Sequence, residues 1–381
     1  MPFEFTQPPR DVLDTQQHAV IDYPDSENHA LIITGCPGSG KTTVANFKVL
    51  DAYERNENCL YMAYAKLLRC YLINCFANNE HLDNFNSHSI VTVMKWYYST
   101  FGTFLLENDY RTVREDILID KFTEYANERF HDKIVIDESQ DLWPNFVQHL
   151  NMISNQIIIC CDDAQDIRGN FDNESPVSNM MESLEDQGVN CNILTLQNNY
   201  RNTEAIYKFA KNFVIGLEVN PGIIQDFKVP GEDKPRIYLR NNRTELLQQI
   251  YVITQNNLEV NVGILCDTIS QVREINSYLT DRGVNSSYYH HKMNDTVLEN
   301  MMFNGEMENI LICTKQSAKG LEFQTVIIPY IDRLENAGRL KLKELYVACT
   351  RAKFNLEIIS SNGQMPLIAE YIQDTNLYDV F

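Results

Sequence analysis

The stretch that decides the fold runs from Ala30 to Ala45 and reads ALIITGCPGSGKTTVA. Apolar, mostly β-branched residues open it as a strand, a glycine-rich turn follows from Gly35 to Gly40, and a helix is expected to begin at Lys41. The spacing Gly-x-x-x-x-Gly-Lys-Thr is that of a P-loop, whose glycines let backbone N–H groups turn inward toward phosphate oxygens. The positive end of the following helix adds to that field. The pattern predicts a site for a nucleoside triphosphate.

The side chains of this loop suggest how the triphosphate is held. Lys41 is expected to reach the β- and γ-phosphates, and the Thr42 hydroxyl is expected to bind Mg²⁺. We therefore expect ATP and Mg²⁺ as the bound groups. The predicted phosphate-binding residues are Gly35, Cys36, Pro37, Gly38, Ser39, Gly40, Lys41, Thr42 and Thr43.

Acidic and amide side chains follow two later apolar strands. A strand that begins near Lys133 ends in Asp137 and Glu138, and a second, from Gln156 to Cys161, is followed closely by Gln165. Asp137 suits the Mg²⁺ of the triphosphate, and Glu138 suits activation of the attacking water. The carboxyl ends of strands form the ligand edge of a doubly wound sheet, so Gln165 is expected to sense the γ-phosphate.

Composition restricts the class of protein. The chain has 381 residues, 44% of them hydrophobic and 22% charged, which is typical of a globular protein with two or three domains. We find no signal-peptide pattern and no apolar run long enough to span a bilayer, so we expect a cytoplasmic protein with no membrane partner. The ten cysteines form no CxxC pair, and several lie in apolar runs, which indicates buried, reduced thiols.

The formal charge of −20 is distributed unevenly. Residues 1–190 carry 13 basic against 30 acidic residues, and residues 191–381 carry 19 against 22. A net negative chain does not attract nucleic acid through bulk charge, so any basic groove has to be local.

Strand-like runs alternate with helical periodicity along the whole chain, which predicts an α/β fold with mostly parallel sheets. We expect two α/β lobes, which the family resemblance described below implies are RecA-like P-loop NTPase lobes. The first, residues 1–190, carries the P-loop and the acidic box. The second, residues 191–381, opens with a strand from Ile193 to Leu196 and contains no P-loop of its own.

An aromatic segment from Ile90 to Tyr98 has two interpretations. Its aromatic residues are able to stack on nucleic acid bases. A strand that runs into a core helix explains the same residues equally well. Residues 103–130 that follow are expected to form one or two amphipathic helices.

Five motifs occur in one order, and with them the chain resembles superfamily 1 helicases of the UvrD/Rep type. The last three motifs are specific to that superfamily, and the large inserted subdomains of its members are missing here. The motifs are the P-loop, DESQD at Asp137–Asp141, NYRN at Asn199–Asn202, TKQSAKGLEF at Thr314–Phe323 and LYVACTRAK at Leu345–Lys353.

The resemblance implies a role for several more residues. Gln17 would recognise adenine, since it fits the family spacing Leu-x-x-x-Gln-x-x-Val better than Gln16 does. Tyr200 would stack on the adenine and Glu322 would contact the ribose, in a nucleotide site that also includes Gly320.

Two arginines complete the implied catalytic set. Arg201 and Arg351 would reach the γ-phosphate from the second lobe as arginine fingers, where two cations stabilise the charge of the transition state and make closure depend on ATP. With Glu138 and Gln165 they are the four predicted catalytic residues.

Three functions compete on this evidence. The first is an ATP-dependent translocase or helicase on single-stranded DNA, moving 3′→5′ by analogy with the family. The second is a nucleotide-controlled switch within a partner complex, for example one that gates a nuclease. The acidic first half, the missing insertions, and Met94 and Gln316 at positions where relatives carry histidine favour it. A P-loop kinase would not need the NYRN and TRAK segments. The DNA contacts expected for the first function are Tyr64, Lys66, Thr92, Trp96, Thr314 and Lys315.

Overall fold

The computed structural model describes residues 7–77, 89–103, 113–128, 130–169, 171, 174–217, 222–333 and 338–381. These residues divide into two compact units. The P-loop unit comprises the described part of residues 7–197 together with residues 222–225, and the C-terminal unit comprises Asn198–Leu217 and Asp226–Phe381 in their described parts. No helix among the described residues is both long and apolar enough to cross a membrane.

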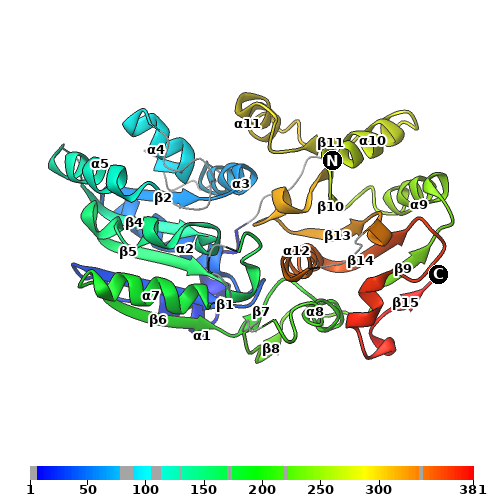
Figure 1. Ribbon diagram of the computed structural model, residues 1–381, viewed down its shortest axis with the longest axis horizontal. Helices are drawn as coiled ribbons and strands as arrows, with labels where there is room; N and C mark the ends of the chain where they lie inside the picture. The colour runs from blue at the N-terminus through cyan, green and yellow to red at the C-terminus, as the bar shows by residue number, and fades with distance from the viewer. Residues whose placement is uncertain are drawn as a thin grey trace. The chain divides into compact units, whose positions relative to one another are not determined.

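The P-loop unit is built on one parallel sheet of six strands in the order β3-β2-β4-β5-β1-β6 (Figure 1). Nearly continuous apolar runs explain the central strands, because a parallel sheet covered on both faces buries both sides of each strand. The strands are β1 (His29–Gly35), β2 (Cys59–Ala63), β3 (Ile90–Thr92), β4 (His131–Asp137), β5 (Ser154–Cys161) and β6 (Asn190–Leu196).

Helices cover both faces of this sheet, and alternate strand residues feed two separate cores. Ile32 of β1 lies in one core with residues of α4 to α7, whereas Ile33 lies in the other with residues of α1 to α3. The helices are α1 (Thr15–Ile21), α2 (Lys41–Glu54), α3 (Lys66–Ala77), α4 (Val93–Phe101), α5 (Glu115–Glu128), α6 (Pro144–Val147) and α7 (Pro176–Asp186). Short 3₁₀ turns lie at Arg10–Val12 (η1), Ser139–Asp141 (η3), Leu150–Met152 (η4) and Asp163–Gln165 (η5).

One strand differs from its expected place. The strand expected to open the second half, from Ile193 to Leu196, is the end of β6. The whole of β6 pairs with β1, from His29↔Asn190 to Gly35↔Leu196. The residues before it, from Asn170 to Asn190, are mostly polar, which favoured a boundary near residue 190. The compact units instead separate after Gln197, at the far end of β6.

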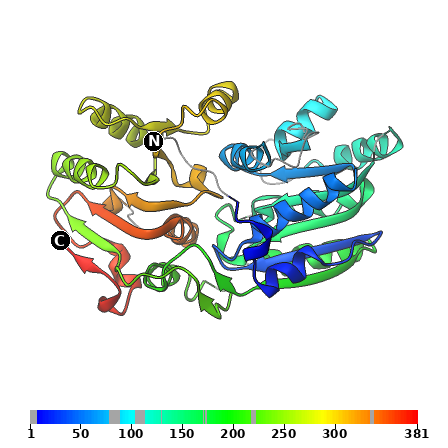
Figure 2. The same ribbon diagram turned by 180° about the vertical axis from the view of Figure 1, so that it is seen from behind.

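The C-terminal unit contains a second parallel sheet, of seven strands in the order β11-β12-β10-β13-β14-β9-β15 (Figure 2). Its strands are β9 (Arg236–Leu239), β10 (Val262–Cys266), β11 (Ser287–Tyr289), β12 (Ile310–Thr314), β13 (Phe323–Ile328), β14 (Ala352–Ser360) and β15 (Asp379–Val380). A separate parallel pair joins β7 (Asn198–Asn199) to β8 (Asp226–Phe227). Two mostly parallel α/β sheets confirm the predicted fold class.

The helices of this unit also lie against the sheet. α9 and α10 pack with β10 and β12 in one apolar core, and α8 and α12 contact each other and β14. The helices are α8 (Glu204–Lys211), α9 (Arg243–Gln255), α10 (Ile269–Thr280), α11 (Asp295–Phe303) and α12 (Arg339–Cys349), with 3₁₀ turns at Lys315–Ala318 (η6), Ile331–Arg333 (η7), Leu367–Tyr371 (η8) and Thr375–Leu377 (η9).

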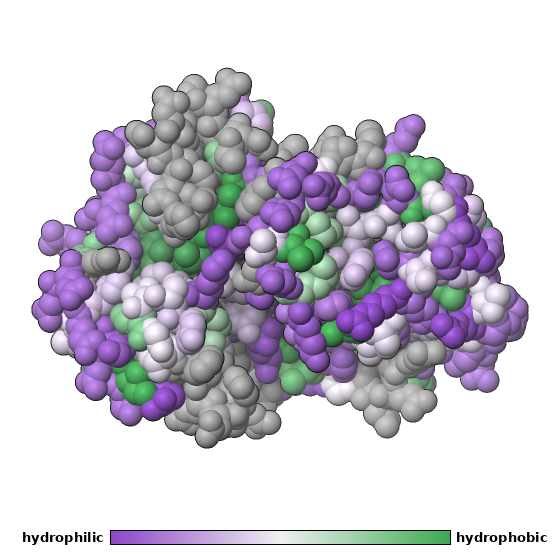
Figure 3. All heavy atoms as spheres, turned by 90° about the horizontal axis from the view of Figure 1, so that it is seen from above, coloured by the Kyte–Doolittle hydropathy of each residue, from purple (hydrophilic) through white to green (hydrophobic). Residues whose placement is uncertain are grey.

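Both units present hydrophilic side chains over much of the face drawn in Figure 3, with apolar residues in smaller groups between them. All ten cysteines lie in the described residues and none of them forms a disulfide; Cys191 is partly exposed and the others are buried.

Candidate functional site

The P-loop lies between β1 and α2, as its spacing predicts. Gly40 takes a φ of +93° at the N-cap of α2, a left-handed conformation that favours glycine. A Cβ atom there would lie 2.4 Å from Nε2 of Gln17, so the end of that side chain would have to shift, and the φ of +93° strains any residue that has a side chain. The loop backbone is thereby fixed against α1.

Lys41 points back across the loop that precedes it. Its ammonium donates to the backbone oxygens of Gly35 at 2.6 Å and Cys36 at 3.1 Å, and to Oδ2 of Asp162 at 3.2 Å. Burial lowers the pKa of Lys41, but the charges of Asp162 and Glu138 outweigh that effect and the pKa is raised. Lys41 is therefore a fully charged cation within the loop.

Thr42 and Asp137 meet at the end of β4. The Thr42 hydroxyl donates to Oδ2 of Asp137 at 2.7 Å, and Asp137 is 2% exposed. Burial, together with the neighbouring charge of Glu138, raises the pKa of Asp137 to about 6. A hydroxyl and a carboxylate in contact are the hard oxygen ligands that Mg²⁺ takes beside phosphate oxygens.

Glu138 lies at the start of a sharp turn. Its φ of +56° is uncommon for a residue with a side chain, and such conformations cluster at functional sites. Gln140 donates from Nε2 to Oε2 of Glu138, and Oε1 of Gln140 accepts from the backbone N–H of Asp162 at 3.1 Å. The Gln140 amide thus joins the turn after β4 to the turn after β5 and holds the Glu138 carboxylate.

Asp162 and Gln165 lie in the turn after β5. Oδ2 of Asp162 accepts from Nε2 of Gln165 at 2.6 Å, and Oδ1 accepts from the backbone N–H of Ala164 at 3.0 Å. Both Asp162 and Gln165 are 2% exposed. The turn therefore brings the predicted phosphate sensor Gln165 into contact with the same carboxylate that binds Lys41.

Gln17 contacts the P-loop and forms a reciprocal cap with Asp14 at the start of α1. Its Nε2 lies 3.5 Å from the backbone oxygen of Ser39, and its Oε1 accepts from the backbone N–H of Asp14 at 3.1 Å. Gln16 instead accepts from the backbone N–H of Gln197 at 2.8 Å. The choice of Gln17 over Gln16 therefore identifies the glutamine that contacts the loop, and its role toward adenine stays a prediction.

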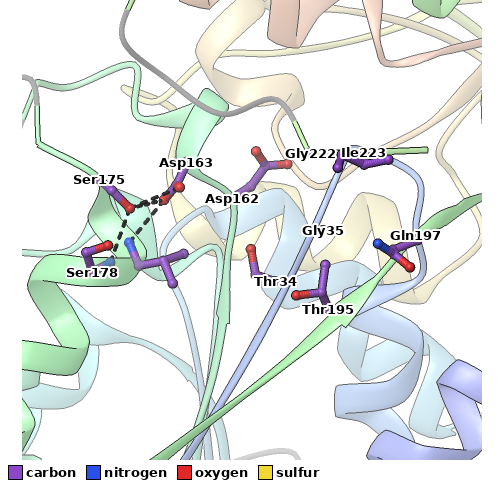
Figure 4. A pocket seen from close by; sticks show the side chains of 11 residues that line it. Thr34, Gly35, Asp162, Asp163, Ser175, Ser178, Thr195, Gln197, Gly222 and Ile223 are labelled. Atoms are coloured by element: carbon purple, nitrogen blue, oxygen red, sulfur yellow. Dashed lines mark hydrogen bonds between the residues drawn. The ribbon is translucent and has the colours of Figure 1, made fainter. Parts of the chain in front are cut away.

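A shallow pocket of about 230 Å³ adjoins the P-loop. Asp162 and Asp163 reach it from the turn after β5, and Thr34 and Thr195 reach it from the ends of β1 and β6 (Figure 4). Carboxylates, hydroxyls and the Gln197 amide supply its polar groups, beside apolar groups such as Val177 and Ile223. The full lining is Thr34, Gly35, Asp162, Asp163, Ser175, Val177, Ser178, Thr195, Gln197, Gly222 and Ile223.

The residues present fit a magnesium nucleotide. The Ser39 hydroxyl is 1% exposed, and its oxygen has no hydrogen-bond partner, which leaves an unsatisfied polar atom within the phosphate loop. No group of three or more His, Cys, Asp or Glu residues in the described part of the chain is placed to hold a metal alone. Mg²⁺ bound by one or two protein oxygens and by the substrate's phosphates needs no such group.

The residues predicted for the second lobe lie in the C-terminal unit. Nε of Arg201 donates to Oε2 of Glu322 at 2.9 Å. Burial raises the pKa of Glu322, but Arg201 and neighbouring basic residues outweigh it and the pKa is lowered. Arg351 is 1% exposed and donates to the backbone oxygens of Val347 and Leu321. Tyr200 follows β7, and Gly320 has a φ of +81° in the turn before β13.

Three of the predicted DNA contacts lie near one edge of the first sheet. Tyr64 and Lys66 follow β2, and Thr92 ends the neighbouring strand β3. The Arg168 guanidinium lies 4.3 Å from the centre of the Tyr64 ring. This edge is the carboxyl edge of the sheet, where Asp137 and the P-loop also lie.

Trp96 requires a correction. It was expected to stack on bases, but it is 6% exposed and its ring packs edge-on against Tyr97, Phe101, Phe122 and Tyr125. The segment is β3 running into core helix α4, the second of the two interpretations of this sequence. Because aromatic residues of its own unit cover Trp96, it has no free face for a base.

Thr314 and Lys315 are also buried, at 7% and 2% exposure. Nζ of Lys315 donates to Oδ1 of Asp267 at 2.8 Å, and the Thr314 hydroxyl bonds with that of Ser317. A contact with a nucleic acid strand at Lys315 would have to compete with this ion pair.

Comparison with known proteins supports the interpretation of the P-loop unit as a P-loop NTPase domain. Residues 25–188, less than half of the chain, match the family model described as AAA domain, which is a P-loop NTPase domain. Among solved structures, the chain is similar to the C-terminal domain of a possible DNA helicase from Lactobacillus plantarum WCFS1. The identity is 17% and the TM-score 0.35, and the similarity covers 48% of this chain and 98% of that domain. No curated protein shows significant similarity to the chain.

Two residues of the site were given no role in the sequence-based predictions. Gln140 follows Glu138 within the acidic box, and Asp162 directly follows β5. Position at the end of a strand was the available signal for Asp162, since the ligand edge gathers such residues. The contact between Gln140 and Glu138 depends on the turn at Glu138, which the spacing alone does not specify.

Proposed function

We propose that the chain binds ATP in the P-loop unit and hydrolyses it. The observation that carries this proposal is the set of contacts at one sheet edge. Lys41 and Thr42 follow the P-loop, and they contact Asp162 and Asp137, which follow β5 and β4. The match of residues 25–188 to a P-loop NTPase domain supports the same conclusion.

The phosphate chain is bound by the loop and its lysine. Backbone N–H groups of the loop and the positive end of α2 favour the negative charge of the phosphates. Lys41 adds a cation that reaches the β- and γ-phosphates, and the Ser39 hydroxyl offers a further donor. Mg²⁺, bound beside Thr42 and Asp137, would neutralise charge on the phosphate oxygens.

The water that attacks the γ-phosphate is activated by Glu138. Its carboxylate accepts a proton from the water or orients it, and Gln140 keeps the carboxylate in place. Gln165 contacts the γ-phosphate and reports its presence to the turn after β5.

We further propose that residues of the C-terminal unit act on the same nucleotide. Arg201 and Arg351 act as arginine fingers, and Tyr200, Glu322, Gly320 and Gln17 hold the adenosine. The NYRN and TRAK segments of the sequence support these roles. Arg201 forms an ion pair with Glu322, so contact with a phosphate requires Arg201 to exchange one anionic partner for another.

The use of ATP that best suits these motifs is translocation along single-stranded DNA, in the 3′→5′ direction by resemblance to the UvrD/Rep type. Tyr64 and Lys66 remain the proposed contacts of the first sheet, whereas Thr92, at 6% exposure, is as buried as Trp96 and is no longer proposed. Burial of Trp96 and the ion pair of Lys315 favour the second candidate, a nucleotide-controlled switch that acts on a partner such as a nuclease.

ATP turnover with and without single-stranded DNA separates the two candidates. The translocase requires turnover to rise when oligothymidylate is added, and Lys66→Ala to reduce that rise. Lys121→Ala, which removes a partly exposed lysine that pairs with Glu124 on α5, serves as the matched control. Turnover that ignores single strands and duplexes would contradict the translocase and favour the switch, whereas no turnover at all would contradict the hydrolase.

A further inference from the structure

One carboxylate oxygen in the P-loop unit serves two functional side chains. Oδ2 of Asp162 accepts from Nζ of Lys41 at 3.2 Å and from Nε2 of Gln165 at 2.6 Å. The side chain of Asp162 is 2% exposed and that of Lys41 10% exposed, so the ion pair is shielded from solvent. Such a pair is screened much less by salt than a surface ion pair.

The ammonium of Lys41 has three protons, and the structure shows an acceptor for each. Two are the backbone oxygens of Gly35 and Cys36, and the third is Asp162. A phosphate oxygen that binds Lys41 has to displace one of these acceptors. Asp162 is the acceptor most readily displaced, because a second anion beside the same cation repels the first.

We propose that Asp162 is a positioning residue that competes with the triphosphate for Lys41. In the nucleotide-free protein it holds Lys41 within the loop, and when phosphate enters it releases Lys41 and retains Gln165. This inference rests on the proposed ATP site and adds to it an internal competitor that lowers affinity for the nucleotide. Asp162 acts through Lys41 and Gln165 and does not itself touch the phosphates.

When Lys41 is released, the Asp162 carboxylate keeps its hydrogen bonds with Gln165 and with the backbone of the turn after β5. Oδ1 of Asp162 stays with the N–H of Ala164, and the backbone N–H of Asp162 stays with Gln140. With Lys41 gone, Gln165 becomes the principal partner of Oδ2, which orients its amide for the γ-phosphate. Asp162 therefore weakens nucleotide binding and at the same time favours the chemical step.

The neighbouring Asp163 provides a matched control. It has the same side chain and also lines the pocket of Figure 4, but it binds the start of α7 instead of the P-loop. Its carboxylate accepts from the Ser175 hydroxyl at 3.0 Å and from the backbone N–H of Val177 at 3.1 Å. Asp163→Asn removes one negative charge near the site without changing a contact of Lys41.

The test measures ATP affinity and turnover in Asp162→Asn and Asp163→Asn. We expect Asp162→Asn to bind ATP about tenfold more tightly, the scale of one charge-assisted hydrogen bond, and to turn it over about tenfold more slowly. Asp163→Asn is expected to keep the wild-type affinity. In a Lys41→Met background the effect of Asp162→Asn on affinity should disappear, since it acts through Lys41.

The outcomes distinguish failure of the proposed competition by Asp162 from failure of the proposed ATP site. If the wild type binds and hydrolyses ATP but Asp162→Asn binds it no more tightly, the competitor is refuted and the proposed function stands. Equal tightening in Asp163→Asn would show a general charge effect and would also refute it. Absence of ATP binding by the wild type would overturn both. Asp162→Ser, with the same expected increase in affinity, replaces Asp162→Asn if that variant does not fold.

Discussion

His131 makes the stability of the P-loop unit depend on pH. It begins β4, is 7% exposed, and lies between the Tyr125 hydroxyl, 2.8 Å from Nε2, and Oδ1 of Asn58, 3.3 Å from Nδ1. Burial lowers the pKa of His131 from 6.5 to about 4, against a smaller opposing effect of Asp132. The folded protein therefore holds His131 neutral at a pH where the unfolded chain takes up a proton.

The sign and size of the pH effect on stability follow from this difference in the pKa of His131 between the folded and unfolded states. Between pH 6.5 and pH 4 the unfolded state binds more protons, so the free energy of unfolding falls as the pH falls. One pH unit corresponds to about 1.4 kcal/mol per proton, so His131 alone removes about 2 kcal/mol by about pH 5. The loss is small near pH 7, where His131 is neutral in both states.

Urea unfolding near pH 7 and near pH 5 measures this loss, with NMR titration of the His131 ring as a direct check. His131→Gln is expected to lower stability at both pH values and to lose about 2 kcal/mol less between them than the wild type. Equal losses in the two proteins, or a ring that titrates near its ordinary pKa, would refute the burial argument.

Three further predictions concern the loop, the core and an ion network. Gly40→Ala should weaken ATP binding at least about tenfold while the protein stays folded, because the φ of +93° strains a residue with a side chain and the new Cβ would displace the Gln17 amide; affinity equal to the wild type would contradict this. Trp96→Ala should lower the free energy of unfolding by about 3–5 kcal/mol in urea melts, whereas a loss under about 1 kcal/mol would mean that the ring is not in the core. Asp25 accepts from the buried amines of Lys48 and Lys133, which lower its pKa well below the ordinary value despite burial. Its ionised form stabilises the fold above about pH 4, so Asp25→Asn should destabilise the protein at pH 7 and flatten its loss of stability in acid, and an unchanged acid profile would count against the network.

Most of the fold follows from local patterns in the sequence. The apolar runs of β1, β4 and β5, each followed by a glycine, acidic or amide residue, indicate parallel strands with a ligand edge. The sequence pattern did not predict that β6 belongs to the first sheet, because a strand's own residues do not specify which sheet it joins. Its partner β1 lies far away in the sequence, and only the register His29↔Asn190 assigns it to the first sheet.

The sequence predicted the parts of the candidate site whose geometry is fixed by motif spacing. It predicted less well the parts whose geometry is fixed by tertiary packing. Lys41 and Thr42 follow from the P-loop, and Asp137 from its position at the end of a strand. Trp96 was predicted as a base-stacking residue but lies in the core. The sequence does not separate these two roles, because an aromatic residue looks the same in both. Phe122 and Tyr125, which cover Trp96, come from a later helix, α5, and no local signal reveals that contact.

The central claim is ATP hydrolysis with Glu138 acting on the water. The most direct test compares ATP turnover and ATP affinity in the wild type and in Glu138→Gln, which keeps the shape of the side chain and removes its ability to accept a proton. We expect Glu138→Gln to keep the wild-type affinity for ATP and to turn ATP over about 10²-fold or more slowly, the scale expected for removal of a general base. Full turnover in Glu138→Gln would contradict it.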